Sequence, residues 1–377
     1  MSEIKVNSIK GVAATTAALT INNTDGTCIA NITNNLSNRR VNKNGSFIIS
    51  QKNGDTEITL SSSGARWIDM IQTFLYNTAT FKAQRVSDAP TGFQYSAKHT
   101  VSSADSSVAN SDEAMFIHRI EGFDAAKFVY GTSGAKQVTV SFYVKSSLTG
   151  DFSFAAQAGG RNYVNEYTIN SANTWERKSF TFPVLTDGTH NTTNGAGLSL
   201  IWDLGSGDDY ATSTLGSWVT ASNLYRSTGS TRLSTNASAT WQITGIQVEE
   251  GTVMSDFEHF SVGQELALCQ RYYQQSYEHG TSAGTSTNTN TIVWYPDATV
   301  NYASVSFGLP CVMRTQPTVT IYSSTGASGK IRNADAATDH NSYVNTNSDS
   351  FLMLTVNNST INASNTVRCH YTASAEL

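Results

Sequence analysis

The sequence has little charge and few residues that kink or cross-link a chain. Only 14% of its 377 residues are charged, and it has 5 prolines and 4 cysteines, whereas roughly 25% charged residues is usual. The net charge is -5, with no run of Lys or Arg, so nothing would attract a nucleic-acid backbone. No segment approaches the ~20 apolar residues of a membrane span. Neither nucleic-acid binding nor membrane insertion is therefore expected.

The cysteines are scattered, and the first residues lead us to expect no secretion signal. Cys28, Cys269, Cys311 and Cys369 include no CxxC pair, so neither a zinc site nor a disulfide framework is indicated. No apolar segment follows the charges of residues 1–6, as a signal peptide would require. We therefore expect free thiols and a chain that folds in a cytosol.

Strand patterns dominate the sequence between residues 45 and 262. Apolar and polar residues alternate in most of these segments, and Gly, Asp and Ser turns separate them. The expected strands are 47–50, 93–101, 138–145, 152–156, 175–182, 198–204 and 239–248. Residues 67–75 fit either a short helix or a strand. This spacing predicts an all-β fold, a jelly-roll-like β-sandwich over residues 45–262.

The segment before the sandwich has a different composition. Residues 1–44 contain no aromatic side chain and only isolated apolar ones, too few to form a core. Residues 4–6 and 19–22 alternate like short strands. An unstructured tail is one interpretation; an extended arm, ordered by a partner and used for attachment, is the one we favour.

A helix and a smaller domain are expected after the sandwich. Ser261 and Gln264 have the spacing of a capping box ahead of residues 265–277, which predicts a connecting helix over 263–279. Its apolar positions include Leu266, Cys269 and Tyr273. A smaller C-terminal β domain then covers 280–377, with expected strands at 291–295, 303–307, 318–322, 351–356 and 366–371.

No catalytic motif occurs in the chain. It lacks the nucleophile elbow, the HExxH helix, the P-loop and the dinucleotide-binding loop, so neither an enzyme nor a cofactor is expected. The densest group of carboxylates is Asp203, Asp208 and Asp209 on a Gly-rich segment. Their oxygens could bind Ca²⁺, but a simple Asp-Gly turn explains the same residues. We therefore predict no metal, with this loop as the alternative.

Aromatic residues in or near loops are candidates for glycan binding, because a ring can stack on the face of a sugar. Trp202 alternates with Leu198 and Leu200, which is typical of a core residue. Trp218 and Tyr225 lie in a Ser/Thr/Gly-rich segment, where exposed rings are expected. The candidate glycan-binding residues are Trp218, Tyr225, Tyr210 and Trp294.

Several motifs, in order, resemble those of bacteriophage tail-fibre and virion appendage proteins. The segment Asn44-Gly-Ser-Phe-Ile-Ile-Ser-Gln51 resembles the opening of the fibre jelly roll, and 140–150 resembles its central strand, which is similar to that of carbohydrate-binding modules. Glu265-Leu-Ala-Leu-Cys-Gln-Arg-Tyr-Tyr273 resembles a helix motif of the same proteins. Other matching segments are 2–7, typical of marine phages, 173–176, 241–258, 313–317 and 371–377. The chain departs from the family pattern at Lys52 and at Ala65-Arg66-Trp67.

This resemblance implies a non-enzymatic virion protein assembled in the host cytoplasm, with the tail as its expected location. It implies a homotrimer whose residues 1–44 bind another virion protein and whose β domains engage a glycan on the host surface. A structural connector or head-decoration protein without a receptor role is an alternative. A polysaccharide-degrading tailspike is another, although such proteins usually contain a long β-helix, and the sequence has no matching repeat.

Overall fold

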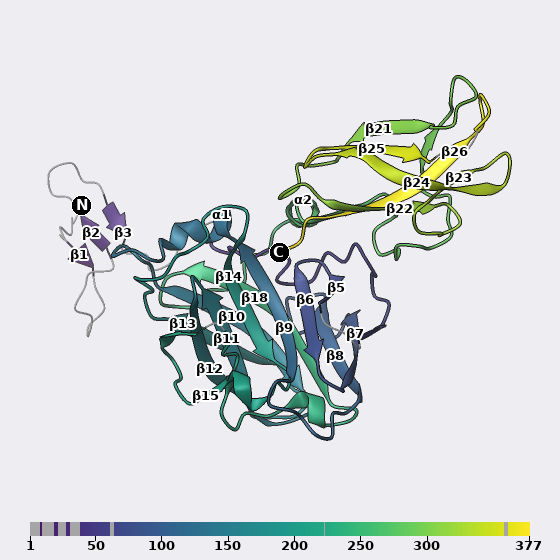
Figure 1. Ribbon diagram of the computed structural model, residues 1–377. Helices are drawn as coiled ribbons and strands as arrows, with labels where there is room; N and C mark the ends of the chain where they lie inside the picture. The colour runs from purple at the N-terminus through teal and green to yellow at the C-terminus, as the bar shows by residue number, and fades with distance from the viewer. Residues whose placement is uncertain are drawn as a thin grey trace, which may run out of the picture.

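The structure is a computed structural model that describes residues 8–9, 19–21, 28–30, 38–60, 64–221, 223–357 and 361–377. Strands predominate in it. A large β-sandwich occupies the middle of the chain, a smaller β domain follows it, and short strands near the N-terminus lie on the opposite side of the sandwich (Figure 1). The all-β prediction is confirmed.

The sandwich consists of two antiparallel sheets between which the chain passes repeatedly. The first, called the β18 sheet, has the order β13 (Glu176–Phe182), β10 (Val138–Ser146), β18 (Thr240–Glu250), β8 (Ser96–Ser103), β7 (Thr80–Val86) and β4 (Ile58–Leu60). The second, called the β9 sheet, has the order β16 (Trp218–Thr220), β12 (Arg161–Ile169), β11 (Gly150–Ala158), β14 (Ala196–Asp203), β9 (Glu113–Glu121), β6 (Ile71–Tyr76) and β5 (Ala65–Ile68). This is the jelly-roll-like arrangement expected from the sequence.

Aromatic side chains fill the space between the two sheets. Phe142 of β10 meets the Trp202 ring edge-on, with centroids 5.3 Å apart, and Phe116 of β9 lies 5.3 Å from Trp241 of β18. All four side chains are completely buried. Trp202 is therefore a core residue, as its alternation with Leu198 and Leu200 indicated.

The strand expected at 47–50 does not form. Phe47 has φ 55°, and Asn44 has φ 54°. The amide of Asn44 donates from Nδ2 to the Ile49 carbonyl (2.9 Å) and accepts from the Ile49 N–H (3.0 Å). This side chain replaces the partner strand, so an irregular segment buries Phe47 without joining a sheet.

Residues 65–76 form a hairpin instead of the helix that one of the two interpretations allowed. β5 and β6 pair antiparallel through Ile68 and Ile71, with a turn at Met70, where φ is 71°. Buried and more exposed side chains alternate along β6, which favours a strand over a helix. Ile71 and Leu75 point into the core, while Tyr76 is exposed.

The predicted capping box is present, but the helix is shorter than expected. Helix α2 spans Val262–Gln270, and Ser261 caps it reciprocally with Gln264. The chain then leaves the helix, and β19 (Tyr273–Gln275) pairs with Ser374 and its neighbours. Strand pairing with the end of the chain therefore overrides the helical pattern that the sequence continued through Tyr277.

The C-terminal domain is a second antiparallel structure built around β26 (Val367–Ser374). Its strands have the order β19, β26, β23 (Lys330–Asn333), β24 (Thr338–Asn347), β25 (Phe351–Val356) and β21 (Ser304–Gly308). Two further strands, β20 (Ile292–Trp294) and β22 (Thr318–Ser323), also pair with β26. The five strands expected from the sequence are present here, whereas β23 and β24 were not foreseen.

Short strands precede the sandwich. β1 (Ser8–Ile9), β2 (Leu19–Ile21) and β3 (Cys28–Ala30) form a small antiparallel sheet. The strand expected at 19–22 is thus confirmed, while that at 4–6 lies outside the described residues. Beyond them, Val41 and Asn42 are buried against β18.

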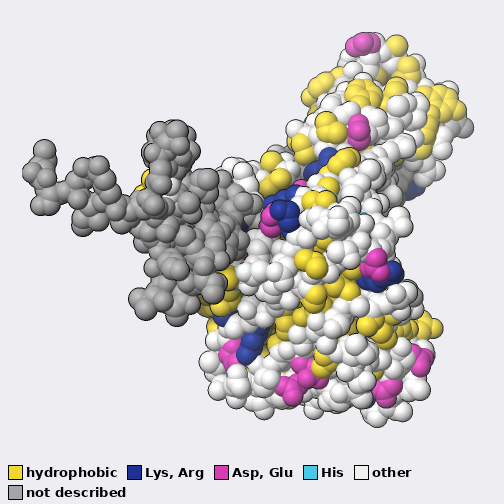
Figure 2. All heavy atoms as spheres, turned by 90° about the vertical axis from the view of Figure 1, so that its left-hand side faces the viewer, with side chains coloured by type: hydrophobic (Ala, Val, Ile, Leu, Met, Phe, Trp, Pro, Cys, Tyr) yellow, Lys and Arg dark blue, Asp and Glu magenta, His cyan; other side chains and the backbone are white. Residues whose placement is uncertain are grey.

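Charges are dispersed over the surface. On the face shown in Figure 2, acidic and basic side chains stand in small separate groups, without a continuous patch of one sign. Within the part of the chain that the structure describes, no helix is long and apolar enough to cross a membrane.

Candidate functional site

The outer face of the β9 sheet, turned away from the β18 sheet, carries a groove. One part is a hollow of about 180 Å³, lined by Phe74, Glu113, Met115, Ile117, Arg119, Gln157, Ser199, Ile201 and Tyr225. A second hollow of about 230 Å³ shares Gln157 and Ser199 with the first and continues to Asn162 and Ala221. The two together, called the outer-face groove, cross the strands from β6 to β12. Four strand spacings make this about 19 Å.

Strand register produces an apolar row and a polar row in the floor of the groove. Ile117 of β9 lies opposite Ile201 of β14, which lies opposite Ala155 of β11. Two residues further along β9, a polar row begins.

In this polar row, Arg119 lies opposite Ser199, Ser199 opposite Gln157, and Gln157 opposite Asn162. Since side chains two residues apart share a face of a strand, both rows point outward. The floor of the groove therefore has a polar row beside an apolar row that is itself buried.

Aromatic rings stand along the groove. Phe74 lines it from β6, and Tyr76, which is 66% exposed, lies opposite Glu113 on the same face. On the other side, the rings of Tyr210 and Tyr225 stack with centroids 5.4 Å apart and an interplanar angle of 19°. Tyr225 packs onto the apolar row, so it forms a wall of the groove.

The ionisable groups of the groove are partly withdrawn from water. Burial, together with the neighbouring charge of Arg66, lowers the pKa of Arg119 to about 10. Arg119 donates to the side-chain oxygen of Gln72 and to the Leu377 carbonyl oxygen (3.3 Å). Burial, followed by a hydrogen bond to Glu113, raises the pKa of Tyr210. The Tyr210 hydroxyl donates to the Ser111 carbonyl (3.3 Å).

Two of the predicted glycan-binding residues, Tyr210 and Tyr225, meet at the groove, but not as the sequence suggested. Tyr225 is only 9% exposed, so the expectation of an exposed ring is wrong for this residue. Its ring is covered because it stacks on Tyr210 and packs on the sheet. Tyr210 is half-buried.

Trp218 and Trp294 lie elsewhere. Trp218 on edge strand β16 packs against Tyr163 and Phe182, with centroids 5.7 and 5.6 Å away, and its Nε1 donates to the Pro183 carbonyl (2.8 Å). It is half-buried beside the core, not an open ring. Trp294 belongs to β20 of the C-terminal domain and packs against that domain's core.

The alternative calcium loop is held by arginines. Asp203 is buried, and its Oδ2 lies 3.8 Å from Arg226 Nε. Asp208 pairs with both Arg226 (2.9 Å) and Arg232 (2.5 Å). Asp209 belongs to a short 3-10 turn, Asp208–Tyr210. Among the described residues, no group of three or more His, Cys, Asp or Glu side chains could hold a metal ion. This loop is therefore organised by guanidinium groups.

Most residues of the groove do not stand out in the sequence. Phe74 lies in segment 67–75, whose sequence fits either a helix or a strand, and Tyr76 follows this segment directly. The strands β9 and β12, which provide Arg119 and Asn162, were not among those expected. The alternation of Gln72, Phe74 and Tyr76 with the apolar Ile71 and Leu75 is the signal that could have revealed one side of the groove.

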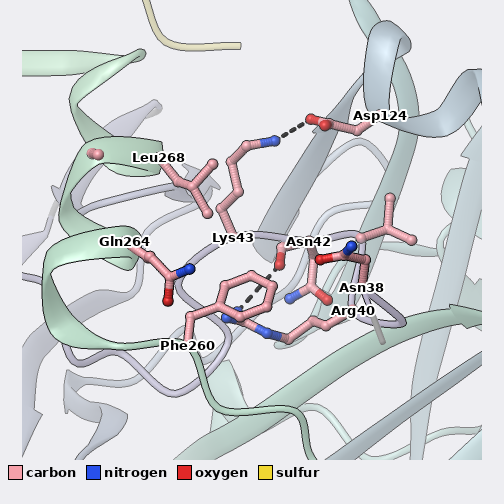
Figure 3. A pocket seen from close by; sticks show the side chains of 10 residues that line it. Asn38, Arg40, Asn42, Lys43, Asp124, Phe260, Gln264 and Leu268 are labelled. Carbon is pink, nitrogen blue, oxygen red and sulfur yellow. Dashed lines mark hydrogen bonds and ion pairs between the residues drawn. The ribbon is translucent and has the colours of Figure 1, made fainter. Parts of the chain in front are cut away.

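A larger hollow of about 470 Å³ lies elsewhere, between residues 38–43, α1 (Gly122–Ala125) and α2 (Figure 3). The Phe260 ring in its wall is covered by the Arg40 guanidinium, whose Cζ is 4.2 Å from the ring centroid. This face of the ring is not free for stacking. The hollow is therefore not a second groove of the same kind.

Comparison with known proteins gives only distant similarities. No protein family matches the sequence, and no curated protein matches it. Among solved structures, the chain is similar to a CBM4 protein, with 15% identity and a TM-score of 0.27 over 55% of this chain and 97% of that one. It is also similar to a family 11 carbohydrate-binding module of a Clostridium thermocellum cellulase, with 11% identity and a TM-score of 0.27 over 54% and 98%.

A third similarity is to discoidin II of Dictyostelium discoideum, with 10% identity and a TM-score of 0.17 over 85% of this chain and 95% of that one. Such low identities and TM-scores support no conclusion about function. The function must be argued from the groove itself.

Proposed function

We propose that the outer-face groove binds a glycan chain and that the protein is a non-enzymatic subunit of a phage fibre or appendage. The observation that carries the glycan proposal is the Phe74 ring at the edge of the groove, beside the polar row that contains Ser199 and Gln157. A sugar ring has apolar C–H faces and a rim of hydroxyl groups. The Phe74 ring suits a C–H face, and the polar row suits the hydroxyl groups.

The side chains in the groove suit such a ligand. Ser199 and Gln157 provide neutral hydroxyl and amide groups, which can donate to and accept from hydroxyls, whereas Asn162 is buried and donates to the Leu224 carbonyl (2.9 Å). Phe74 offers a ring at the edge of the groove, and aromatic surface is typical of ligand sites with a few placed polar groups. The two hollows adjoin at Gln157 and Ser199, so an occupant longer than a single sugar can reach both.

The wider role is supported by the ordered motifs that resemble phage fibre proteins. In this proposal, the chain is a homotrimer in the virion, with the tail as its location. Residues 1–44 attach it to another virion protein, and the sandwich faces the host surface. The absence of a recognisable catalytic motif in the sequence favours binding over polysaccharide degradation.

The replacement of Phe74 by Ala tests glycan binding. If the ring stacks on a sugar, its loss should weaken binding by about 1 to 3 kcal/mol, as with bases stacked on aromatic side chains. That corresponds to roughly 5- to 150-fold in Kd. The readout is binding of the purified protein to an array of bacterial surface glycans and to intact host cells.

Phe351→Ala is the matched control, because Phe351 is an exposed phenylalanine of β25 in the C-terminal domain. It should bind as the wild type does. If the wild type binds no glycan and no host cell, the receptor role is wrong, and a structural connector becomes the better assignment. Release of shortened saccharide from the array would instead favour a tailspike.

A further inference from the structure

One end of the outer-face groove is acidic. Glu113, the first residue of β9, lines the hollow of about 180 Å³, and the exposed Asp209 belongs to the same turn as Tyr210. Burial raises the pKa of Tyr210, and the charges of Glu113 and Asp209 raise it further. Both carboxylates therefore act on one phenol, at one end of the groove.

The cationic side chains near this end are engaged elsewhere. The guanidinium groups of Arg226 and Arg232 both pair with Asp208, at 2.9 and 2.5 Å. In the part of the chain that the structure describes, no ion pair includes Glu113 or Asp209. A ligand at this end therefore meets negative charge that the chain itself leaves without a cation.

The other charged residue of the hollow, Arg119, lies six positions further along β9. At about 3.3 Å per residue, its Cα is about 20 Å from that of Glu113. Its guanidinium donates to the side-chain oxygen of Gln72 and to the Leu377 carbonyl oxygen. Arg119 is therefore no partner of Glu113, and the hollow is negative at one end only.

Aromatic rings flank the Glu113 carboxylate. Tyr76 lies directly opposite Glu113 across the β6–β9 pair, and Phe74 lies opposite Met115. Directly opposite side chains have Cβ atoms about 5 Å apart, and diagonal neighbours are also within reach of an aromatic ring. The face of such a ring attracts a cation. A carboxylate beside aromatic rings thus suits an ammonium group better than a neutral hydroxyl, and it repels an acidic sugar.

We propose that the groove selects a glycan that carries a free amino group, and that Glu113 is the residue that determines this specificity. The ammonium group donates to the Glu113 carboxylate beside the Tyr76 ring. Its sugar lies against Phe74, and the following units reach Ser199 and Gln157. An N-acetylated amino group carries no charge and forgoes the ion pair. The inference rests on the proposed glycan binding and adds the chemical class of the ligand.

The test compares two probes, a β-linked glucosamine tetrasaccharide and its fully N-acetylated form. Binding is measured by calorimetry in mildly acidic buffer, where the amino groups are charged. The wild type should bind the amino form about 10-fold or more tightly than the N-acetylated form, because hydrogen bonds to charged groups are the stronger ones. Glu113→Gln should bind the two alike. Added salt should reduce the preference of the wild type.

Glu278→Gln is the matched control, because Glu278 is exposed in the C-terminal domain and the change removes the same charge. It should keep the wild-type preference. If it loses the preference as Glu113→Gln does, the amino probe responds to net charge, and the proposed specificity is wrong. A preference that survives in Glu113→Gln would overturn the proposal as well.

A second variant keeps the test independent of the folding of Glu113→Gln. Tyr76→Ala removes an exposed ring and should weaken binding of the amino probe by about 2- to 5-fold, without a similar effect on the N-acetylated probe. Equal weakening of both probes would count against an ammonium beside this ring.

The outcomes separate this proposal from glycan binding itself. If the wild type binds glycans on the array but shows no preference for the amino probe, glycan binding stands and the amino specificity is wrong. If it binds no glycan and no host cell, both proposals fall. If tetralysine binds as tightly as the amino probe, the groove recognises a cationic peptide equally well, and the assignment to an amino sugar is overturned.

Discussion

Acidification to about pH 5 should destabilise the sandwich, because two histidines are buried in it without charge. His99 lies among the rings of Trp67 and Phe116, with centroids 5.5 and 5.6 Å away. His118 points into the core from β9. Burial lowers the pKa of each from 6.5 to about 3, and for His118 the charges of Arg40 and Lys43 add to the effect.

The direction of the change in stability follows from which state, folded or unfolded, binds the proton. Between pH 6.5 and 3, these histidines take up a proton only when the chain unfolds, so protonation favours the unfolded state. Their contribution to stability is complete above about pH 6.5 and is lost as the pH falls toward 3. At about pH 5, an unfolded-state pKa of 6.5 corresponds to a loss of about 2 kcal/mol per histidine, or about 4 kcal/mol for both. The free energy of unfolding of a folded domain is only about 5 to 15 kcal/mol in total.

The assay is urea unfolding at about pH 7.5 and about pH 5, followed by the fluorescence of the buried Trp202 and Trp241. From about pH 7.5 to about pH 5, the free energy of unfolding should fall by about 4 kcal/mol in the wild type and by about 2 kcal/mol in His118→Leu. The two proteins share every other titrating group, so the difference reports His118 alone. His279→Leu, at an exposed position, should lose as much as the wild type. An equal loss in His118→Leu and the wild type would refute the reasoning.

Three further predictions concern the helix, the buried ion pair and the thiols. Ser261→Ala removes the cap of α2 and should lower stability by about 1 kcal/mol in thermal unfolding; an unchanged melting temperature would contradict this. Glu265→Gln leaves the buried Arg40 without its carboxylate and should cost about 3 to 5 kcal/mol, measured by urea unfolding at neutral pH. Cys311 and Cys369 are free, so both should be alkylated in the denatured, unreduced protein, and a mass showing them protected would disprove it.

Local sequence patterns were sufficient to predict the elements that depend on regular alternation or on neighbouring residues. Strands such as β10 and β18 alternate apolar and polar residues because one side of each faces the core. The start of α2 was predictable since a capping box needs only Ser261 and Gln264. Its end was not, because β19 pairs with residues more than ninety positions later in the chain.

The groove could not be predicted from the sequence, because its rows exist only through strand register. Arg119, Ser199 and Gln157 come from three strands, and nothing local places them in line. The strand β9 was missed since it is buried on both faces along much of its length, so it lacks the simple alternation of an exposed strand. Tyr225 was expected to be exposed because it lies in a Ser/Thr/Gly-rich segment, but a stacking partner, Tyr210, covers it.

The segment at residues 41–45 has a mechanical consequence. Val41 donates its N–H to the Val248 carbonyl, and Ile246 donates to the Gly45 carbonyl, both at 2.9 Å. Asn42 adds two side-chain bonds to the same strand, from Nδ2 to the Ile246 carbonyl (2.8 Å) and from the Val248 N–H to Oδ1 (2.9 Å). A pull transmitted along this segment from residue 38 therefore meets several hydrogen bonds to one strand. Tension on the N-terminal side is thereby carried directly into β18, the long strand in the middle of its sheet.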